Sequence, residues 1–327
     1  MGSFNDALNR LWCTRNVISC TLWPLSLLYR AVIRARRLAY SVGWLESHRF
    51  NVPVIVVGNL SVGGAGKTPM VIAIANLLKN EGWSPGIISR GYGGSAEHWP
   101  QTVTPESSAD LVGDEPVVIA RRAGCPVVVA PDRPAAVRQL IDENECNVLI
   151  SDDGLQHLAL NRDIEIAVVD GGAGFGNGFC LPAGPLREPV SRLDSVDFVV
   201  YNGGQGDGHR CVIEGDRAVK VINNFVSRLL DEFSGRMVHA VAAIGNPARF
   251  FEHLRSAGLE VIEHPFPDHH KFDVADLQFE DDGPILMTEK DAVKCEAFAG
   301  ENMWYVPVDA KLAPSFQDEL SKRLNSL

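Results

Sequence analysis

The first two-thirds of the chain alternates between short runs of consecutive apolar residues and stretches with apolar residues at helical spacing. The runs at residues 54–57, 127–130, 148–150 and 164–169 consist almost wholly of Val, Ile, Leu and Ala. Strands that are apolar on both sides are typical of a parallel sheet covered by helices on both faces. We therefore predict an α/β domain with a mostly parallel sheet at residues 51–205.

The same strand–helix pattern begins again after a polar, glycine-containing stretch. Apolar runs at residues 238–244 and 285–288 lie on either side of a segment with helical spacing at 248–257. At 327 residues the chain is long for a single hydrophobic core, which favours two domains. We predict a linker at residues 206–235 and a smaller α/β domain at residues 236–327.

Residues 8–47 mix apolar and basic residues, with Trp and Tyr side chains between them. The charge-free stretch at 16–29 contains Pro24 and is shorter than the roughly 20 residues that cross a bilayer. Aromatic and basic residues together are typical of a helix that lies at a membrane surface. We predict an amphipathic helical segment of this kind at residues 1–50. The alternative is a pair of helices packed on the core with solvated arginines.

Charge and cysteine content narrow the class of protein further. The net charge of −11 argues against a general nucleic-acid binder. The charge is uneven, because residues 1–50 carry seven Arg against two acidic residues and the rest of the chain is strongly acidic. The seven Cys show neither a CxxC pair nor a metal-ligand spacing, which is typical of reduced thiols in the cytosol.

A phosphate-binding motif follows the apolar run at residues 54–57. The run leads into a glycine-rich loop that ends in Gly66, Lys67 and Thr68, and a helical pattern begins directly afterwards. Strand, glycine loop, Lys-Thr and helix form the pattern of a P-loop. Backbone N–H groups and the helix N-terminus bind phosphate oxygens. We predict that Lys67 reaches the β- and γ-phosphates and that Thr68 ligates Mg²⁺.

The loop departs from the usual P-loop pattern at its first glycine position, where this chain has Ser61. Two glycines inside the loop compensate for this change. The alternative interpretation is a glycine-rich turn with an unrelated lysine. The residues that we predict to bind nucleotide here are Ser61, Gly63, Gly64, Ala65, Gly66, Lys67 and Thr68.

Further polar groups follow the other predicted strands, at the carboxyl ends where ligands bind in open parallel sheets. Asp152 and Asp153 follow the run at 148–150, as a Mg²⁺-binding Walker B carboxylate does. An acidic pair in this position can instead cap a helix. Arg187 and Glu188 lie between prolines, which favours a phosphate clamp or a metal-linked carboxylate over the alternative of a local ion pair.

A set of motifs in fixed order resembles the tetraacyldisaccharide 4'-kinase family, the lipid A 4'-kinases. The motifs are SVGGAGKTP, ISRGYGG, VGDEP, APDR, SDDGLQH, LPAGPLREP, FPDHH and MTEKDAVK, and the resemblance covers residues 52–308. It implies ATP- and Mg²⁺-dependent phosphorylation of the 4'-hydroxyl of a tetraacyldisaccharide 1-phosphate, a lipid A precursor. It also implies a peripheral enzyme on the cytoplasmic face of the bacterial inner membrane, with two α/β domains that close over the substrate.

The resemblance also implies roles for individual residues. Asp114 of VGDEP matches the catalytic base, and His269 of FPDHH would hydrogen-bond it, with Asp268 supporting His269. His270 is the competing candidate for this role. Residues expected around the phosphates, the metal or the sugar are Glu115, Arg133, Gln156, His157, Arg187 and Glu188. The expected metal ligands are Thr68, Asp152, Asp153, Glu115 and Glu188.

Two other classes of protein would also use a P-loop. One is a nucleotide-hydrolysing switch, although the Thr288–Asp291 segment matches a guanine-reading motif poorly. The other is a membrane-peripheral, nucleotide-binding scaffold without lipid phosphorylation. Neither needs a pair such as Asp114 and His269, since a scaffold has no use for a base. Nothing in the sequence points to an obligate protein partner.

Overall fold

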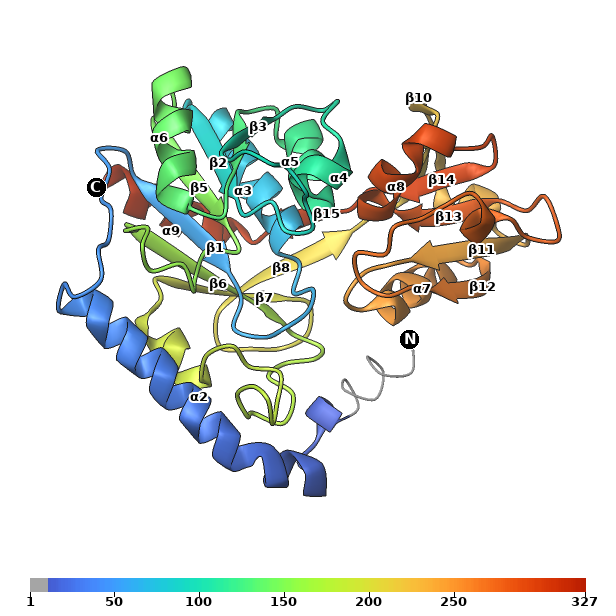
Figure 1. Ribbon diagram of the computed structural model, residues 1–327. Helices are drawn as coiled ribbons and strands as arrows, with labels where there is room; N and C mark the ends of the chain where they lie inside the picture. The colour runs from blue at the N-terminus through green and yellow to red at the C-terminus, as the bar shows by residue number, and fades with distance from the viewer. Residues whose placement is uncertain (1–10) are drawn as a thin grey trace.

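The computed structural model describes residues 11–327, which build two sheets with their helices (Figure 1). The first sheet has nine strands in the order β15-β8-β7-β6-β1-β5-β2-β4-β3. Its inner strands are parallel, and the edge strands β3 and β15 are antiparallel to their neighbours. The strands are β1 (Val54–Gly58), β2 (Pro85–Ser89), β3 (Gln101–Val103), β4 (Val127–Val129), β5 (Val148–Asp152), β6 (Ile164–Asp170), β7 (Phe198–Asn202), β8 (His209–Glu214) and β15 (Asp309–Leu312).

Helices cover both faces of this sheet, as the apolar strands predict. In β1, Ile55 and Val57 pack into one core cluster and Val54 and Val56 into the other. Side chains from α3, α5 and α9 fill the first cluster, and side chains from α6 fill the second. The helices of this unit are α3 (Lys67–Asn80), α4 (Ala109–Val112), α5 (Asp114–Ala123), α6 (Arg133–Glu143) and α9 (Pro314–Asn325).

The second sheet has six strands in the order β10-β9-β14-β13-β11-β12. Its core contains Phe233, Phe251 and Trp304. The strands are β9 (Arg217–Lys220), β10 (Asn223–Leu229), β11 (Met237–Ala242), β12 (Glu260–Pro265), β13 (Ile285–Thr288) and β14 (Met303–Val306), and the α-helices are α7 (Pro247–Ser256) and α8 (Glu289–Cys295). The predicted fold class, a P-loop-type α/β domain with a smaller second α/β unit, is therefore confirmed.

The division of the chain between the two sheets differs from the predicted boundaries. Strand β8 lies within the predicted linker yet belongs to the first sheet, and β9 and β10 belong to the second. After β14 the chain returns, so that β15 pairs with β8 and Phe316, Leu320 and Leu324 of α9 enter the first core. The local apolar pattern could not predict this return, because it does not say which sheet edge a short strand joins.

Helix α2 (Val17–Ser41) is a 25-residue helix that lies along the first unit (Figure 1). Asn16 caps it by accepting a hydrogen bond from the Ser19 N–H. Pro24 lies inside the helix and does not end it, so the helix is longer than the charge-free stretch. By length and composition α2 could cross a membrane, and only 11% of its most apolar window is buried. The first ten residues of the predicted 1–50 segment lie outside the described residues.

Candidate active site

The P-loop lies between β1 and α3 and is shaped by close backbone approach. Gly66 has a φ of +90°, and a Cβ atom there would collide with Ile213 and Asn202. No side chain caps α3 among the described residues, which leaves its first N–H groups for an anion. Ser61 forms an antiparallel bridge with Leu186. Ser61, which stands where the usual P-loop pattern has its first glycine, therefore pairs the loop with the segment that precedes Arg187.

Lys67 occupies the first turn of α3 and points back along the loop. Its Nζ donates to Asn59 Oδ1 at 3.2 Å and lies 3.6 Å from Asp153 Oδ1. Asn59 is fully buried and also donates to the Gly63 carbonyl at 3.3 Å. Asn59 therefore links the lysine to the loop backbone, a role that the motif pattern did not predict.

Asp152 ends β5, next to β1 in the sheet. Its side chain is 1% exposed, and its Oδ2 accepts a hydrogen bond from Ser89 Oγ at 3.3 Å. The other oxygen, Oδ1, is buried without a hydrogen-bond partner in residues 11–327. Burial, and then the charges of Glu115 and Asp153, raise the pKa of Asp152 to about 7. A buried carboxylate oxygen without a partner fits a ligand for Mg²⁺.

Asp153 follows directly and faces two cations. Arg187 Nη1 lies 3.0 Å from both carboxylate oxygens, and Lys67 approaches the same group. Burial by itself raises the pKa of Asp153, but the charges of Lys67 and Arg187 outweigh it and hold the pKa below its ordinary value. Asp153 is therefore ionised beside the lysine and the arginine that are predicted to bind phosphate.

Asp114 and His269 meet across the two units. Asp114 begins α5, is 5% exposed, and its Oδ2 lies 3.3 Å from His269 Nδ1. Burial raises the pKa of Asp114, but the hydrogen bond to His269 and the charge of Lys290 bring it below its ordinary value. The hydrogen bond to Asp114 raises the pKa of His269. Asp268 Oδ1 lies 3.8 Å from His269 Nε2.

The competing histidine has a different partner. His270 Nε2 lies 2.8 Å from Asp276 Oδ2, within the second unit. The two adjacent histidines are therefore divided between two carboxylates, and the one that contacts Asp114 is His269.

Two lysines that were not among the predicted site residues contact acidic residues of the site. Lys290 Nζ lies 3.1 Å from Glu115 and 3.5 Å from Asp268. Lys294 Nζ lies 3.9 Å from Asp114. The MTEKDAVK motif contains both lysines, but only the packing of α8 against α5 shows which acids they serve.

Four other predicted residues make no hydrogen bond or ion pair with Lys67 within residues 11–327. Arg133 is 2% exposed and donates to the Ile88 carbonyl and Ser151 Oγ; burial lowers its pKa to about 10. Burial likewise lowers the pKa of His157 to about 4. Gln156 donates to Glu188 at 2.9 Å. Glu188 also pairs with Arg37 and Arg192, so these contacts lend no support to its predicted role as a metal ligand.

A further contact between the units braces the P-loop. Arg249 of α7 donates to Asp170 at 3.3 Å and to Asn202 at 3.1 Å. Asn202 in turn donates to the carbonyl of Ala65 at 3.1 Å. No motif pointed to Arg249, Asp170 or Asn202, because they lie far apart in the sequence and none belongs to the glycine loop.

A P-loop, a buried aspartate with an unpartnered oxygen and a carboxylate–imidazole pair held between two α/β units define a P-loop phosphotransferase. A family model described as Tetraacyldisaccharide-1-P 4'-kinase matches residues 18–325. The chain belongs to this family. The family resemblance and the kinase class predicted from the motifs are thus confirmed, and the switch and scaffold alternatives are not favoured.

Individual relatives agree with this assignment over nearly the whole chain. The tetraacyldisaccharide 4'-kinase of Nitrosococcus oceani is 49% identical over 99% of this chain and 98% of its own length. That of Hahella chejuensis is 47% identical over 98% and 97%. The crystal structure of LpxK from Aquifex aeolicus in complex with ATP superposes with a TM-score of 0.78, at 29% identity, over 94% of this chain and 100% of that chain.

Proposed function

We propose that this chain transfers the γ-phosphoryl group of ATP to the 4'-hydroxyl of a tetraacyldisaccharide 1-phosphate, with Mg²⁺, as a peripheral enzyme on the cytoplasmic face of the bacterial inner membrane. Family membership supports the reaction, and the ATP complex of the solved relative supports the nucleotide. The observation that carries the proposal is the contact of Asp114 with His269 beside the P-loop. Gly245 of the second unit lies between the P-loop and the residues around His269. The position that a Cβ atom would take at Gly245 is 3.2 Å from the Gly64 N and 3.7 Å from Asp268 Oδ2, so the P-loop and the Asp114–His269 pair adjoin.

Phosphoryl transfer requires neutralisation of the phosphate charge. Lys67, Arg187 and the N-terminus of α3 provide positive charge at the P-loop. Thr68 and Asp152 would hold Mg²⁺, with Asp153 beside them, and the unpartnered Asp152 oxygen fits this role. Bound Mg²⁺ supplies charge neutralisation at the β- and γ-phosphates.

The transfer also requires an acceptor for the hydroxyl proton. Asp114 is ionised, since its pKa lies below the ordinary value, and an ionised carboxylate accepts a proton. His269 Nδ1 orients Asp114 through the 3.3 Å contact, and Asp268 and Lys290 hold His269 and the adjoining acids in place. The 4'-hydroxyl proton then passes to Asp114 as the oxygen attacks the γ-phosphorus, and the bond from that phosphorus to the β–γ bridging oxygen breaks, so that ADP leaves.

The substrate explains an exposed apolar helix. Each buried CH₂ group stabilises membrane insertion by about 0.8 kcal/mol, so a lipid with four acyl chains stays in the bilayer. Several apolar side chains of α2 are more than half exposed: Val17, Ile18, Leu25, Leu28, Val32 and Leu38. We assign to this face of α2 the contact with the membrane surface.

The test is the transfer of radiolabelled phosphate from ATP to a tetraacyldisaccharide 1-phosphate in detergent micelles, with and without Mg²⁺. A labelled lipid that forms only with Mg²⁺ is the expected result. A folded, ATP-binding protein that labels no lipid would contradict the proposed reaction. Flotation of the protein with phospholipid vesicles tests the membrane contact separately.

A further inference from the structure

Helix α2 has a second face, and that face contacts the two loops that carry the predicted phosphate-binding residues. Tyr29 Oη donates to the carbonyl of Arg187 at 3.1 Å. Arg37 Nη1 lies 3.2 Å from the carboxylate of Glu188. Arg36 Nη1 donates to the Gln156 carbonyl at 3.0 Å. Arg36 and Arg37 follow Tyr29 by seven and eight positions, about two helical turns, and therefore lie on the same side of the helix as Tyr29. The three contacts thus come from one face of α2.

These contacts continue to the P-loop through side chains. The Gln156 amide donates both to Glu188 at 2.9 Å and to the Asn59 carbonyl at 3.2 Å. Asn59 Oδ1 accepts the hydrogen bond from Lys67. An unbroken series of polar contacts therefore joins Arg37 to Lys67 through Glu188, Gln156 and Asn59.

A second branch of the contacts ends at Asp153. The Arg187 N–H donates to the Leu60 carbonyl at 2.6 Å, and the Arg187 guanidinium binds both oxygens of Asp153. Tyr29 holds the carbonyl of this same arginine. The placement of Arg187 therefore depends on the segment between β1 and the P-loop on one side and on α2 on the other.

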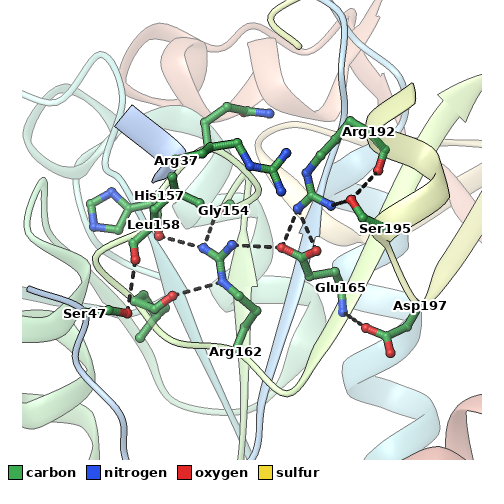
Figure 2. Close-up of polar contacts among 12 residues, drawn as sticks. Arg37, Ser47, Gly154, His157, Leu158, Arg162, Glu165, Arg192, Ser195 and Asp197 are labelled. Atoms are coloured by element: carbon green, nitrogen blue, oxygen red, sulfur yellow. Dashed lines mark hydrogen bonds and ion pairs between the residues drawn. The ribbon is translucent and has the colours of Figure 1, made fainter. Parts of the chain in front are cut away.

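The side of these loops that faces the sheet is braced by a buried ionic network (Figure 2). Arg192, whose side chain is 2% exposed, binds both oxygens of Glu165 at 2.6 Å. Arg162 binds Glu165 at 2.8 Å and donates to the carbonyls of His157, Leu160 and Gly154. The loop after Asp153 is thus supported on this side by buried ion pairs, whereas the contact from α2 is made by a more accessible side chain, since Arg37 is 39% exposed.

We propose that α2 is a positioning element that couples its docking on a lipid surface to the placement of Arg187 and Lys67. Tyr29 and Arg37 are the positioning residues, and they act through Arg187 and Glu188. The coupling rests on the proposed membrane contact of the apolar face of α2. The enzyme then reaches its full kcat when the lipid surface that contains the substrate holds α2 against the loops of Arg187 and Gln156.

Three variants separate positioning from simple membrane attraction. Tyr29→Phe removes one hydroxyl and keeps the ring. Arg37→Gln removes one charge and the pair with Glu188. Arg34→Gln is the matched control, because Arg34 lies on the same helix, is exposed, and makes no ion pair or side-chain hydrogen bond within residues 11–327.

We measure kcat and the KM for ATP in micelles that contain saturating lipid substrate. Membrane binding is measured separately, by flotation with phosphatidylglycerol vesicles. We expect Tyr29→Phe and Arg37→Gln to lower kcat by about 3- to 10-fold, the size of coupling through a contact network. Arg34→Gln should keep the wild-type kcat, and it should lower flotation as much as Arg37→Gln, since each variant removes one charge.

Wild-type kcat and KM in both Tyr29→Phe and Arg37→Gln would overturn the proposal. If Arg37→Gln does not fold, Tyr29→Phe decides by itself. If the wild-type protein fails to float with vesicles, the membrane contact is wrong and the coupling to a surface falls with it. Failure of the reaction itself is seen separately, as the absence of labelled lipid with the wild-type enzyme.

Discussion

Left-handed backbone marks two polar residues of the candidate site. Among residues 11–327, the non-glycine residues with positive φ are Asp153, at 47°, and His269, at 60°. Such a conformation costs about 1–3 kcal/mol and persists where the surrounding structure over-determines it. Arg187 holds Asp153, and Asp114 holds His269. Each residue is therefore held by a contact that also belongs to the proposed chemistry.

The role of Asp114 as the base predicts a specific kinetic loss. Asparagine has the same shape as aspartate but cannot accept the hydroxyl proton, so Asp114→Asn should lower kcat by about 10²- to 10⁴-fold. Phosphate transfer and ATP binding are measured on the same preparation. Asp276→Asn is the control, because Asp276 holds the neighbouring His270 instead. Near-normal kcat in folded Asp114→Asn would remove Asp114 from the mechanism.

The raised pKa of His269 predicts a pH-dependent contribution to stability. The folded protein holds this proton more tightly than the unfolded chain does, because Asp114 accepts the hydrogen bond. The stabilisation is therefore fully present below the ordinary histidine pKa of about 6.5 and is lost as pH rises through the raised value. We expect His269→Gln to reduce the free energy of unfolding by on the order of 1 kcal/mol near pH 6, and by less near pH 9.

Urea unfolding of both proteins at the two pH values measures this difference. An equal loss at both pH values would mean that the His269 proton does not contribute to stability through Asp114.

At the scale of elements, the junction of the P-loop and α3 leaves no room for a side chain at Gly66. Gly66 has a φ of +90° and its Cβ position is occupied by Ile213 and Asn202. We expect Gly66→Ala to lower the free energy of unfolding by about 1–3 kcal/mol. Gly64→Ala is the matched control in the same loop, since a Cβ atom there meets nothing within 4 Å, and it should change stability by less than about 0.5 kcal/mol. Equal thermal shifts in the two variants would contradict this explanation.

At the scale of the whole molecule, the second unit reaches the P-loop through Arg249. Its contacts with Asp170 and Asn202 cross between the units, and Asn202 holds the Ala65 carbonyl. Arg249→Ala should raise the KM for ATP by about 3- to 10-fold. The change in stability should stay below about 1 kcal/mol, because the Arg249 side chain is 42% exposed.

A second arginine of α7 provides the comparison. Arg255 pairs with Glu263 inside the second unit, so Arg255→Ala removes the same charge without touching the P-loop. Steady-state kinetics with varied ATP distinguish the two variants. An unchanged KM in Arg249→Ala would show that the contact between the units does not reach the nucleotide.

The sequence by itself determined the features that depend on neighbouring residues. Apolar runs and glycine positions act over a few residues, so they predicted β1, the P-loop and α3. The motif order predicted the family and, through it, the pairing of Asp114 with His269, which no local rule supplies across 155 positions.

Only the tertiary structure decided which distant groups meet. It returned β15 and α9 to the first sheet and left one oxygen of Asp152 without a partner in residues 11–327 while Arg187 binds both oxygens of Asp153. It also brought Tyr29 to the Arg187 carbonyl and Arg249 to Asn202, which holds the P-loop. The physical reason is that sheet pairing and helix docking are chosen by the packing of the whole chain. An arginine therefore has the same local pattern whether it faces solvent, as Arg34 does, or a buried carboxylate, as Arg37 does.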